Sequence, residues 1–224
     1  MNKLLLLALL AAFSIATIWM APHFGAAEYS DQIRALRLPR AALAWFSGGA
    51  LAVAGLLMQT LLRNDLATPF TLGVASSASF GAFVCFAFPS IAATIWAPPL
   101  LGFICAIATI ALIIKLGSSN LGHNGILLVG ITINFVFGAA LMIVRHLAPP
   151  YRMTKLEHWL MGSIETSSFE PAWVVATAAL LCLAIIWTKR HDLDQYSFDI
   201  KVAQARGVNV SKLMNVGLAT SGLL

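Results

Sequence analysis

Six long apolar stretches, separated by short polar connections, dominate the pattern of the chain. A helix needs roughly 20 apolar residues to cross the hydrocarbon core of a bilayer, which is about 30 Å thick. The stretches that reach or approach this length are 4–20, 41–62, 72–91, 95–116, 125–144 and 171–188. They are continuously apolar and do not alternate with period two, so a transmembrane β-barrel is disfavoured. We therefore expect an all-α, polytopic membrane protein with six complete transmembrane helices in a single domain over residues 1–224.

The first and last apolar stretches need separate arguments. Lys3, the apolar stretch and the small residues at 25–27 also fit a secretory signal, but the stretch is longer than the roughly 7 to 15 residues of a signal core and further membrane segments follow it. A transmembrane helix is favoured. A seventh apolar stretch begins near Lys212 and stops at Leu224 after thirteen residues, so it predicts the start of a seventh helix. We expect the C-terminal part of a longer fold to be missing from this chain.

Composition excludes the main soluble classes. The chain is 59% hydrophobic and only 10% charged, which does not fit a soluble enzyme or a disordered protein. Its net charge of +5 does not indicate nucleic-acid binding, because the basic residues lie in the connections and form no basic face. With a cytoplasmic N-terminus, eight of the fourteen basic residues face the cytoplasm and six face outward. This weak bias agrees with the positive-inside rule and favours that orientation.

Small and polar residues mark one face of three predicted helices. These faces are Gly48, Ala52, Gly55 and Gln59 in the second helix, Gly73, Ser77 and Gly81 in the third, and Gly130, Asn134 and Gly138 in the fifth. Small residues let helices approach closely, and a polar side chain in a bilayer must face protein or water. Close packing is favoured over a solute pathway, although the amides of Gln59 and Asn134 are candidates for both. We expect Asn134 to face protein or water.

The sequence contains no visible chemistry of its own. No ionisable residue lies at the centre of an apolar stretch, which disfavours a proton- or sodium-coupled carrier. There is no phosphate-binding G-x-x-x-x-G-K-[ST] loop and no catalytic motif, and no charge ring that would indicate a self-contained channel. Cys85, Cys105 and Cys182 lie inside apolar stretches and predict neither disulfides nor a metal cluster. We expect no catalytic site, cofactor or metal in this chain, and another subunit must supply any energy.

Two polar regions are candidates for contacts with partners. Arg34, Arg37 and Arg40 gather on an expected outer loop before the second helix, where they suit either an acidic partner or lipid headgroups. After the sixth helix, Phe198, Val202 and Ala205 recur at i, i+4 and i+7 and predict a short amphipathic helix.

Gly207 is well placed to end that helix in the left-handed conformation. A helix this short needs a surface, which is either the bilayer interface or a cleft on another subunit.

Several separated motifs carry a resemblance to a known family. They are R-L-P-R at 37–40, G-G-A-L-A-V-A-G at 48–55, Q-T-L-L-R-N-D-L-A-T-P at 59–69, L-G-V at 72–74, G-I at 130–131, W-L-M-G-S at 159–163, Ala203, and G-V-N-V at 207–210. In order and spacing the chain resembles the FecCD-type permeases of ABC importers for iron-siderophore, haem and vitamin B12. It departs from them at Asp65, where the family usually has Pro, and at Ile200 and Lys201, where acidic residues are usual. The family also has roughly ten membrane helices, and its last segments are absent here.

The resemblance implies a function and an assembly. The chain would be a permease subunit in the bacterial inner membrane that pairs with a second permease subunit, identical or different. It would take a ferric siderophore, haem or cobalamin from a periplasmic binding protein, and two cytoplasmic ATPase subunits would use ATP to drive the import. The alternative is a non-transporting membrane scaffold or sensor derived from a truncated permease.

The resemblance also assigns roles to residues. Arg37 and Arg40 are similar to arginines that dock the binding protein. Gly138 and Ala139 in the fifth helix are similar to the part of the family's fold that bears the gate, beside the pathway candidates Gln59 and Asn134. A cytoplasmic coupling segment, 189–211, is similar to the family's ATPase contact, and the residues that match there are Ala203, Gly207, Val208 and Asn209.

Overall fold

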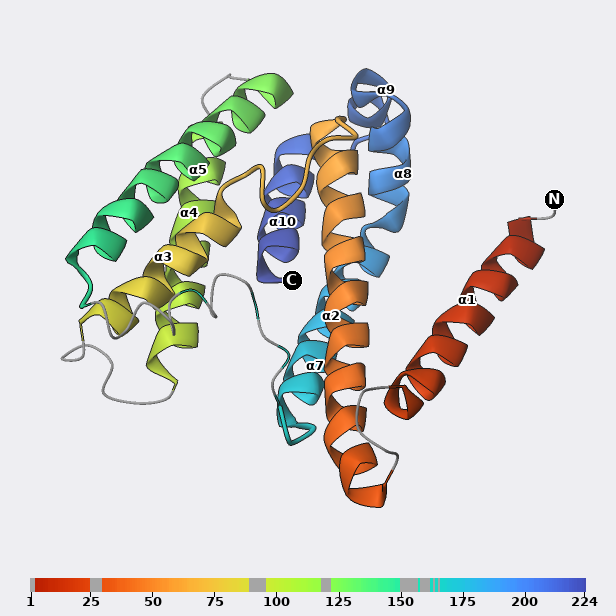
Figure 1. The fold of residues 1–224 in the computed structure, drawn as a ribbon. Coiled ribbons are helices and arrows are strands. Elements are labelled where there is room, and N and C mark those ends of the chain that lie inside the picture. The colour runs from red at the N-terminus through yellow and green to blue at the C-terminus, as the bar shows by residue number, and fades with distance from the viewer. Residues whose placement is uncertain are drawn as a thin grey trace. The chain divides into compact units, whose positions relative to one another are not determined.

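The computed structural model describes residues 3–24, 30–88, 96–117, 122–149, 157, 162, 164 and 166–224, and in these residues it is all helical (Figure 1). The elements are α1 (Lys3–Met20), the 3-10 turn η1 (Ala21–His23), α2 (Asp31–Leu62), α3 (Val74–Ala87), α4 (Ala97–Gly117), α5 (Gly122–Leu147), α7 (Glu170–Thr188), α8 (Arg190–Phe198), α9 (Ile200–Ala205) and α10 (Val210–Leu223). The predicted all-α class is confirmed. The small residues at 25–27 and most of the W-L-M-G-S motif at 159–163 lie outside the described residues.

Five of the six expected segments have the length and composition of a transmembrane helix in the described part of the chain. They are Leu5–His23, Asp31–Leu62, Ala97–Leu116, Gly125–Leu147 and Glu170–Thr188. The third segment was expected over 72–91, but α3 has only 14 residues. Its start is set by Gly73, which is left-handed at φ 74°, and Phe88 after its last residue is extended, as residues before a proline tend to be. Residues 89–91 of the expected segment lie outside the described residues.

Helix α2 begins ten residues earlier than the apolar pattern predicts. The Ser30 hydroxyl accepts a hydrogen bond from the Ile33 amide at 3.3 Å, and the Ser30 carbonyl accepts one from the Arg34 amide, which is the arrangement of a helix N-cap. Arg37 and Arg40 therefore lie on a helix, and the prediction of an outer loop is wrong. Hydropathy did not predict the first ten residues of α2, because charged residues interrupt the apolar run there. Pro39 lies within these turns and does not end the helix.

The chain forms two compact units, one of Met1–Ala50 with Ile164–Leu180 and one of Leu51–Ser163 with Leu181–Leu224. In the second unit α3, α4 and α5 pack against one another, and α10 contacts α4, α8 and α9. One buried cluster in this unit runs from the last turns of α2 into the short helices, with Leu61, Tyr196, Ala203 and Leu213 among its members. The short helices that follow α7 thus share a core with the membrane helices.

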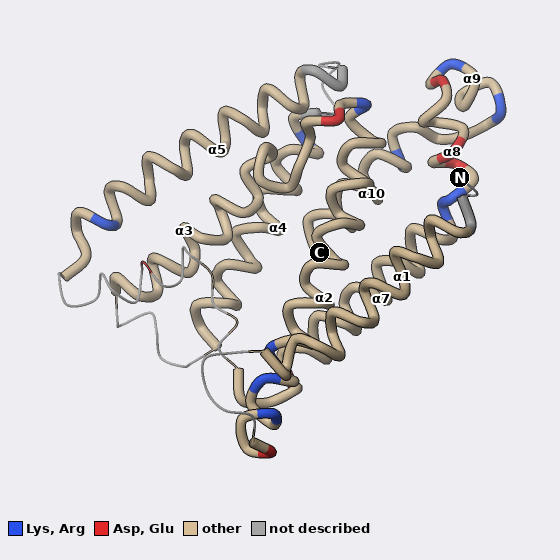
Figure 2. The backbone as a smooth tube through the Cα atoms, turned by 45° about the vertical axis from the view of Figure 1, so that its right-hand side comes forward, with Lys and Arg blue, Asp and Glu red and all other residues tan. Residues whose placement is uncertain are grey.

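Charge and exposed apolar surface are distributed as a membrane protein requires. Figure 2 shows Lys, Arg, Asp and Glu near the ends of the long helices, with uncharged residues along most of their length. Large apolar side chains remain exposed in the described chain, among them Phe135 at 74%, Met142 at 75% and Leu181 at 67%. Exposed apolar surface on this scale is typical of helices that face lipid or a partner subunit.

Candidate functional site

The two candidate docking arginines lie in the first unit and contact its loops. The Arg37 Nη1 donates a hydrogen bond to the Pro22 carbonyl at 3.2 Å, and the Arg40 Nε donates one to the Thr166 carbonyl at 3.2 Å. Arg37 is half-buried and Arg40 is exposed. A guanidinium has five N–H donors, so one bond to a carbonyl leaves Arg40 able to meet a carboxylate. Docking remains a prediction, and Arg40 is the better placed of the two for it.

Asn134 joins α5 to α3. Its amide oxygen accepts a hydrogen bond from the Ser76 hydroxyl. A side chain at Gly73 would lie 2.8 Å from the Asn134 backbone nitrogen, so the two segments touch at this level. The expectation that Asn134 faces protein or water is confirmed. Its role in a pathway remains a prediction, and sequence reasoning did not identify Ser76 as its partner.

The other pathway candidates have different surroundings. The Gln59 amide donates to the Asp65 carbonyl at 3.0 Å, so this side chain closes the turn that follows α2. Among the described residues, no atom lies within 4 Å of where a side chain at Gly138 would begin, and Ala139 is exposed. These two residues therefore lie on an open face of α5. A pathway role for all three remains a prediction.

Close packing of small residues is confirmed in α3 and α5 but not in α2. A side chain on Gly81 would lie 2.6 Å from the Leu101 carbonyl oxygen of α4, and one on Gly130 would lie 2.7 Å from the Leu72 Cα atom. By contrast, Gly48 and Gly55 have nothing within 4 Å among the described residues. The glycines of the small-residue face of α2 thus have no close neighbour in the part of the chain that the structure describes.

The predicted coupling segment, residues 189–211, differs from the single amphipathic helix that was expected. It forms two helices, α8 and α9, which separate at Asp199 with extended backbone angles. The Asp199 carboxylate accepts hydrogen bonds from the Lys201 and Val202 amides at 2.7 and 3.0 Å. A side chain that caps a new helix in this way competes with continuation of the old one.

The three apolar positions of the expected face, Phe198, Val202 and Ala205, do not lie on one helix, because Phe198 ends α8 and the other two belong to α9. Phe198 is 81% exposed and Ala205 is exposed, whereas Tyr196 and Ala203 are fully buried. Tyr196 was not identified from the sequence, because its burial depends on packing against the last turn of α2. Because the chain is extended at Asp199, α9 does not continue the axis of α8, and the buried side of the segment differs from that of one continuous helix.

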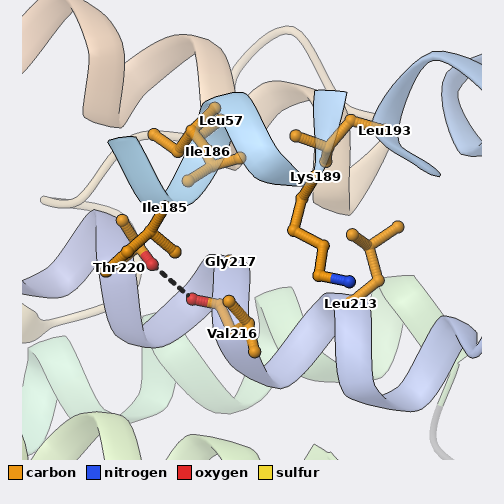
Figure 3. A pocket seen from close by; sticks show the side chains of 9 residues that line it. All are labelled: Leu57, Ile185, Ile186, Lys189, Leu193, Leu213, Val216, Gly217 and Thr220. Atoms are coloured by element: carbon orange, nitrogen blue, oxygen red, sulfur yellow. Dashed lines mark hydrogen bonds between the residues drawn. The ribbon is translucent and has the colours of Figure 1, made fainter. Parts of the chain in front are cut away.

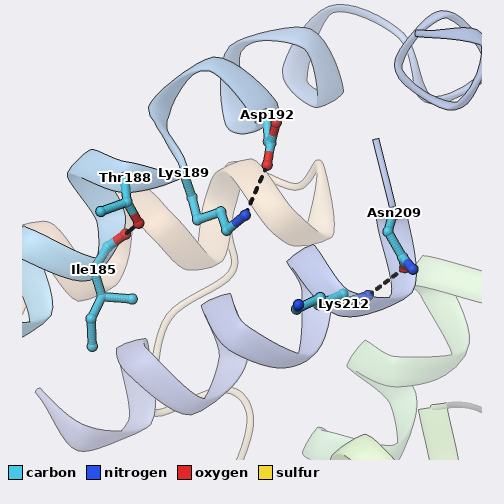
Figure 4. Close-up of polar contacts among 6 residues, drawn as sticks. All are labelled: Ile185, Thr188, Lys189, Asp192, Asn209 and Lys212. Atoms are coloured by element: carbon cyan, nitrogen blue, oxygen red, sulfur yellow. Dashed lines mark hydrogen bonds and ion pairs between the residues drawn. The ribbon is translucent and has the colours of Figure 1, made fainter. Parts of the chain in front are cut away.

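The matched residues of the coupling segment build the corner between α9 and α10. Gly207 is left-handed at φ 85°, as predicted. The Val208 amide donates to the Ala203 carbonyl and the Gly207 amide to the Gln204 carbonyl, both at 3.0 Å, which is a Schellman end. The Asn209 side chain then caps α10 by accepting from the Lys212 amide at 2.9 Å (Figure 4). Their coupling to an ATPase remains a prediction.

Tyr196 connects α8 to the last turn of α2. Its hydroxyl donates a hydrogen bond to the Leu61 carbonyl at 2.8 Å. Burial raises the pKa of Tyr196 to about 12, partly opposed by the nearby Arg63 guanidinium, so the hydroxyl stays protonated. The two amides that bind Asp199, helped by Arg63, hold the pKa of that carboxyl below its ordinary value. The side chain of Arg63, at the end of α2, thus influences both α8 and α9.

An apolar groove of about 220 Å³ lies among α2, α7, α8 and α10 (Figure 3). Its lining residues are Leu57, Ile185, Ile186, Lys189, Leu193, Leu213, Val216, Gly217 and Thr220. The Lys189 ammonium pairs with Asp192 at 3.3 Å (Figure 4), and the Thr220 hydroxyl donates to the Val216 carbonyl at 2.7 Å. The polar groups of the groove are thus engaged with one another or with the backbone, which suits helix packing better than solute recognition.

No group of three or more metal-ligating side chains occurs in the part of the chain that the structure describes.

Comparisons with known proteins agree across nearly the whole chain. The model of the FecCD transport family matches residues 4–224. The achromobactin transport system permease of Dickeya dadantii is 31% identical, over 89% of this chain and 56% of its own length. The hemin transport system permease of Yersinia pestis is 30% identical, over 84% of this chain and 61% of its own. The molybdate import system permease of Haemophilus influenzae is 30% identical, over 84% of this chain and 56% of its own.

A solved structure has a similar fold. It is described as an inward-facing conformation of a metal-chelate type ABC transporter, and it matches with a TM-score of 0.84 at 26% identity. The match covers 96% of this chain and 70% of that one. The chain spans a little over half the length of the curated relatives it matches.

Proposed function

The chain belongs to the FecCD transport family, and from that premise we propose that it is the membrane permease subunit of an ATP-driven importer for a ferric siderophore. The observation that carries the proposal is the family match over residues 4–224, together with the fold shared with a metal-chelate type ABC transporter. Haem and cobalamin are the alternative cargoes within the same class.

The candidate pathway residues support a division of labour between subunits. Gln59, Asn134, Gly138 and Ala139 carry no charge, and the two amides are engaged with Asp65 and Ser76 of the same chain. A pathway of this kind has little means of distinguishing one chelate from another, because selectivity needs placed polar groups. Selection therefore falls to the periplasmic binding protein. The relatives named for achromobactin, hemin and molybdate fit one permease architecture that serves several cargoes.

The assembly follows from the orientation with a cytoplasmic N-terminus in the bacterial inner membrane. Arg37 and Arg40 then face the periplasm and dock the binding protein, while the 189–211 segment faces the cytoplasm and meets an ATPase subunit. A second permease subunit completes the pathway, and two ATPase subunits supply the energy, because the sequence holds no ATP-binding loop of its own. The open face of α5 at Gly138 and Ala139 is where the second subunit would approach.

The docking role of the arginines is tested by reversing their charge. The variant Arg37→Glu with Arg40→Glu should slow association of the binding protein about tenfold or more at low salt, because charges at an interface rim act mainly on the association rate. The difference should vanish near 1 M salt, where the Debye length is about 3 Å. Association of the purified binding protein with the transporter in nanodiscs is measured across ionic strength.

Lys115→Glu is the control, because it reverses one exposed charge in the last turn of α4, on the side assigned to the cytoplasm and outside the 189–211 segment. It should leave the association rate unchanged. Equal rates and salt slopes for wild type and the Arg37 and Arg40 variant would leave these residues as lipid anchors. A chain that assembles with its ATPase but passes no chelate would instead support the scaffold or sensor alternative.

A further inference from the structure

The Tyr196 hydrogen bond lies where the last turn of α2 needs a partner. The final carbonyls of a helix have no amide donor within their own helix, and the Leu61 carbonyl belongs to that turn. Leu61 and Tyr196 are both fully buried, so water does not replace the Tyr196 hydroxyl, which donates at 2.8 Å from a residue 135 positions away. Tyr196 is thus a tertiary cap on α2, supplied by α8.

Helices α8 and α9 contact each other, and both contribute to one buried cluster. Asp199 caps the start of α9 with two hydrogen bonds, and the Schellman end at Gly207 closes it. Ala203 of α9 is fully buried in the same cluster as Leu61 and Tyr196. Through this cluster α9 packs against α8, which carries Tyr196.

The structure points to Tyr196 as a positioning residue. We propose that its hydrogen bond to Leu61 makes α8, α9 and the last turn of α2 move as one body, so that force on the cytoplasmic helices reaches α2. The assignment of that force to an ATPase subunit rests on the proposed function. Because α2 is one helix of 32 residues, about 48 Å long at 1.5 Å per residue, the helix that receives the movement also carries Arg37 and Arg40.

The link is tested first in the chain alone, in nanodiscs, by hydrogen exchange. Tyr196→Phe removes one hydroxyl and keeps the ring, so amides in α8 and at 59–64 should both exchange about tenfold faster, with α3 and α4 unchanged. Thr220→Val is the matched control, because it deletes a hydroxyl that bonds within α10, and its effect should stay in α10. Faster exchange confined to α8, or no change at either place, would overturn the proposal.

The second measurement asks whether movement is transmitted. In the complex with the ATPase that co-purifies with the chain, exchange is compared without nucleotide and after trapping with ATP and vanadate. In wild type, trapping should change exchange about threefold or more both in α8–α9 and at 59–64. In Tyr196→Phe the change should stay in α8–α9, which a purely structural role would not produce.

The outcomes separate the two proposals. Equal changes at 59–64 in wild type and Tyr196→Phe would overturn transmission through this hydrogen bond. If trapping altered nothing in α8–α9 of wild type, the proposed ATPase coupling would fail, and the measurement on the chain alone would still decide whether Tyr196 links the two elements.

Discussion

Helices α3 and α4 approach closely at Gly81, and Gly81→Ala tests that contact. The new Cβ atom would lie 2.6 Å from the Leu101 carbonyl oxygen and 2.9 Å from the Cys105 sulfur. The first distance is about 0.8 Å short of ordinary contact at 3.4 Å, and the Leu101 oxygen cannot swing away because it belongs to the backbone of α4. The two helices must separate, and overpacking of this kind costs typically 1–3 kcal/mol.

Gly138→Ala is the matched control for this substitution. It adds the same methyl group to a helix, but nothing lies within 4 Å of the new atom. It should therefore gain from better helix propensity, by up to about 1 kcal/mol. We expect the unfolding free energies of the two variants to differ by about 2 kcal/mol or more, with Gly81→Ala the less stable.

Unfolding of the chain in mixed micelles by a denaturing detergent, followed by tryptophan fluorescence, measures this difference, since the sequence has six Trp residues. Gly81→Ala should begin to unfold at a lower detergent fraction than wild type, and Gly138→Ala at the same or a higher one. Equal midpoints for the two variants would refute the argument that the contact between α3 and α4 requires glycine at position 81.

Three further predictions use the same unfolding measurement. Asn134→Leu leaves the Ser76 hydroxyl without its acceptor and should lower the unfolding free energy by about 1 kcal/mol. The loss should exceed that of the volume-conserving Leu127→Ile, and equal losses would contradict the hydrogen bond between α3 and α5. The folded-state pKa of Tyr196 is raised from 10.0 to about 12. The contribution of Tyr196 to the unfolding free energy is therefore complete below pH 10 and falls by up to about 3 kcal/mol as the pH rises to about 12. A Tyr196→Phe variant whose stability has the same pH slope would exclude Tyr196 as the cause. The Gln195 side-chain oxygen is buried without a donor among the described residues, so Gln195→Leu should leave stability unchanged or raise it by up to about 1 kcal/mol, and a clear loss would show that this oxygen has a partner.

The membrane class and the helical fold could be read from the sequence because they depend on local composition. Apolar runs of nearly 20 residues have few ways to satisfy their backbone in a bilayer other than as helices. The left-handed Gly207 was predicted for a similar reason, since a glycine just past a helix needs no distant partner to adopt that conformation. Asn134 could be predicted to face protein or water because an amide in hydrocarbon must find a partner somewhere.

The partners themselves were decided by the tertiary structure. Gly55 and Gly81 belong to similar small-residue patterns, yet only Gly81 meets a neighbouring backbone among the described residues. Hydropathy did not show that α2 extends over Arg37 and Arg40, because charged residues lower the hydropathy of its first turns. The start of the helix is set by the Ser30 cap.

The burial of Tyr196 could not be predicted either. The break at Asp199 turns α9 away from the direction of α8, and the hydrogen bond to Leu61 joins residues 135 positions apart. Such a contact exists only after helices distant in sequence have packed, since their packing sets which face is buried and which carbonyl lies within reach.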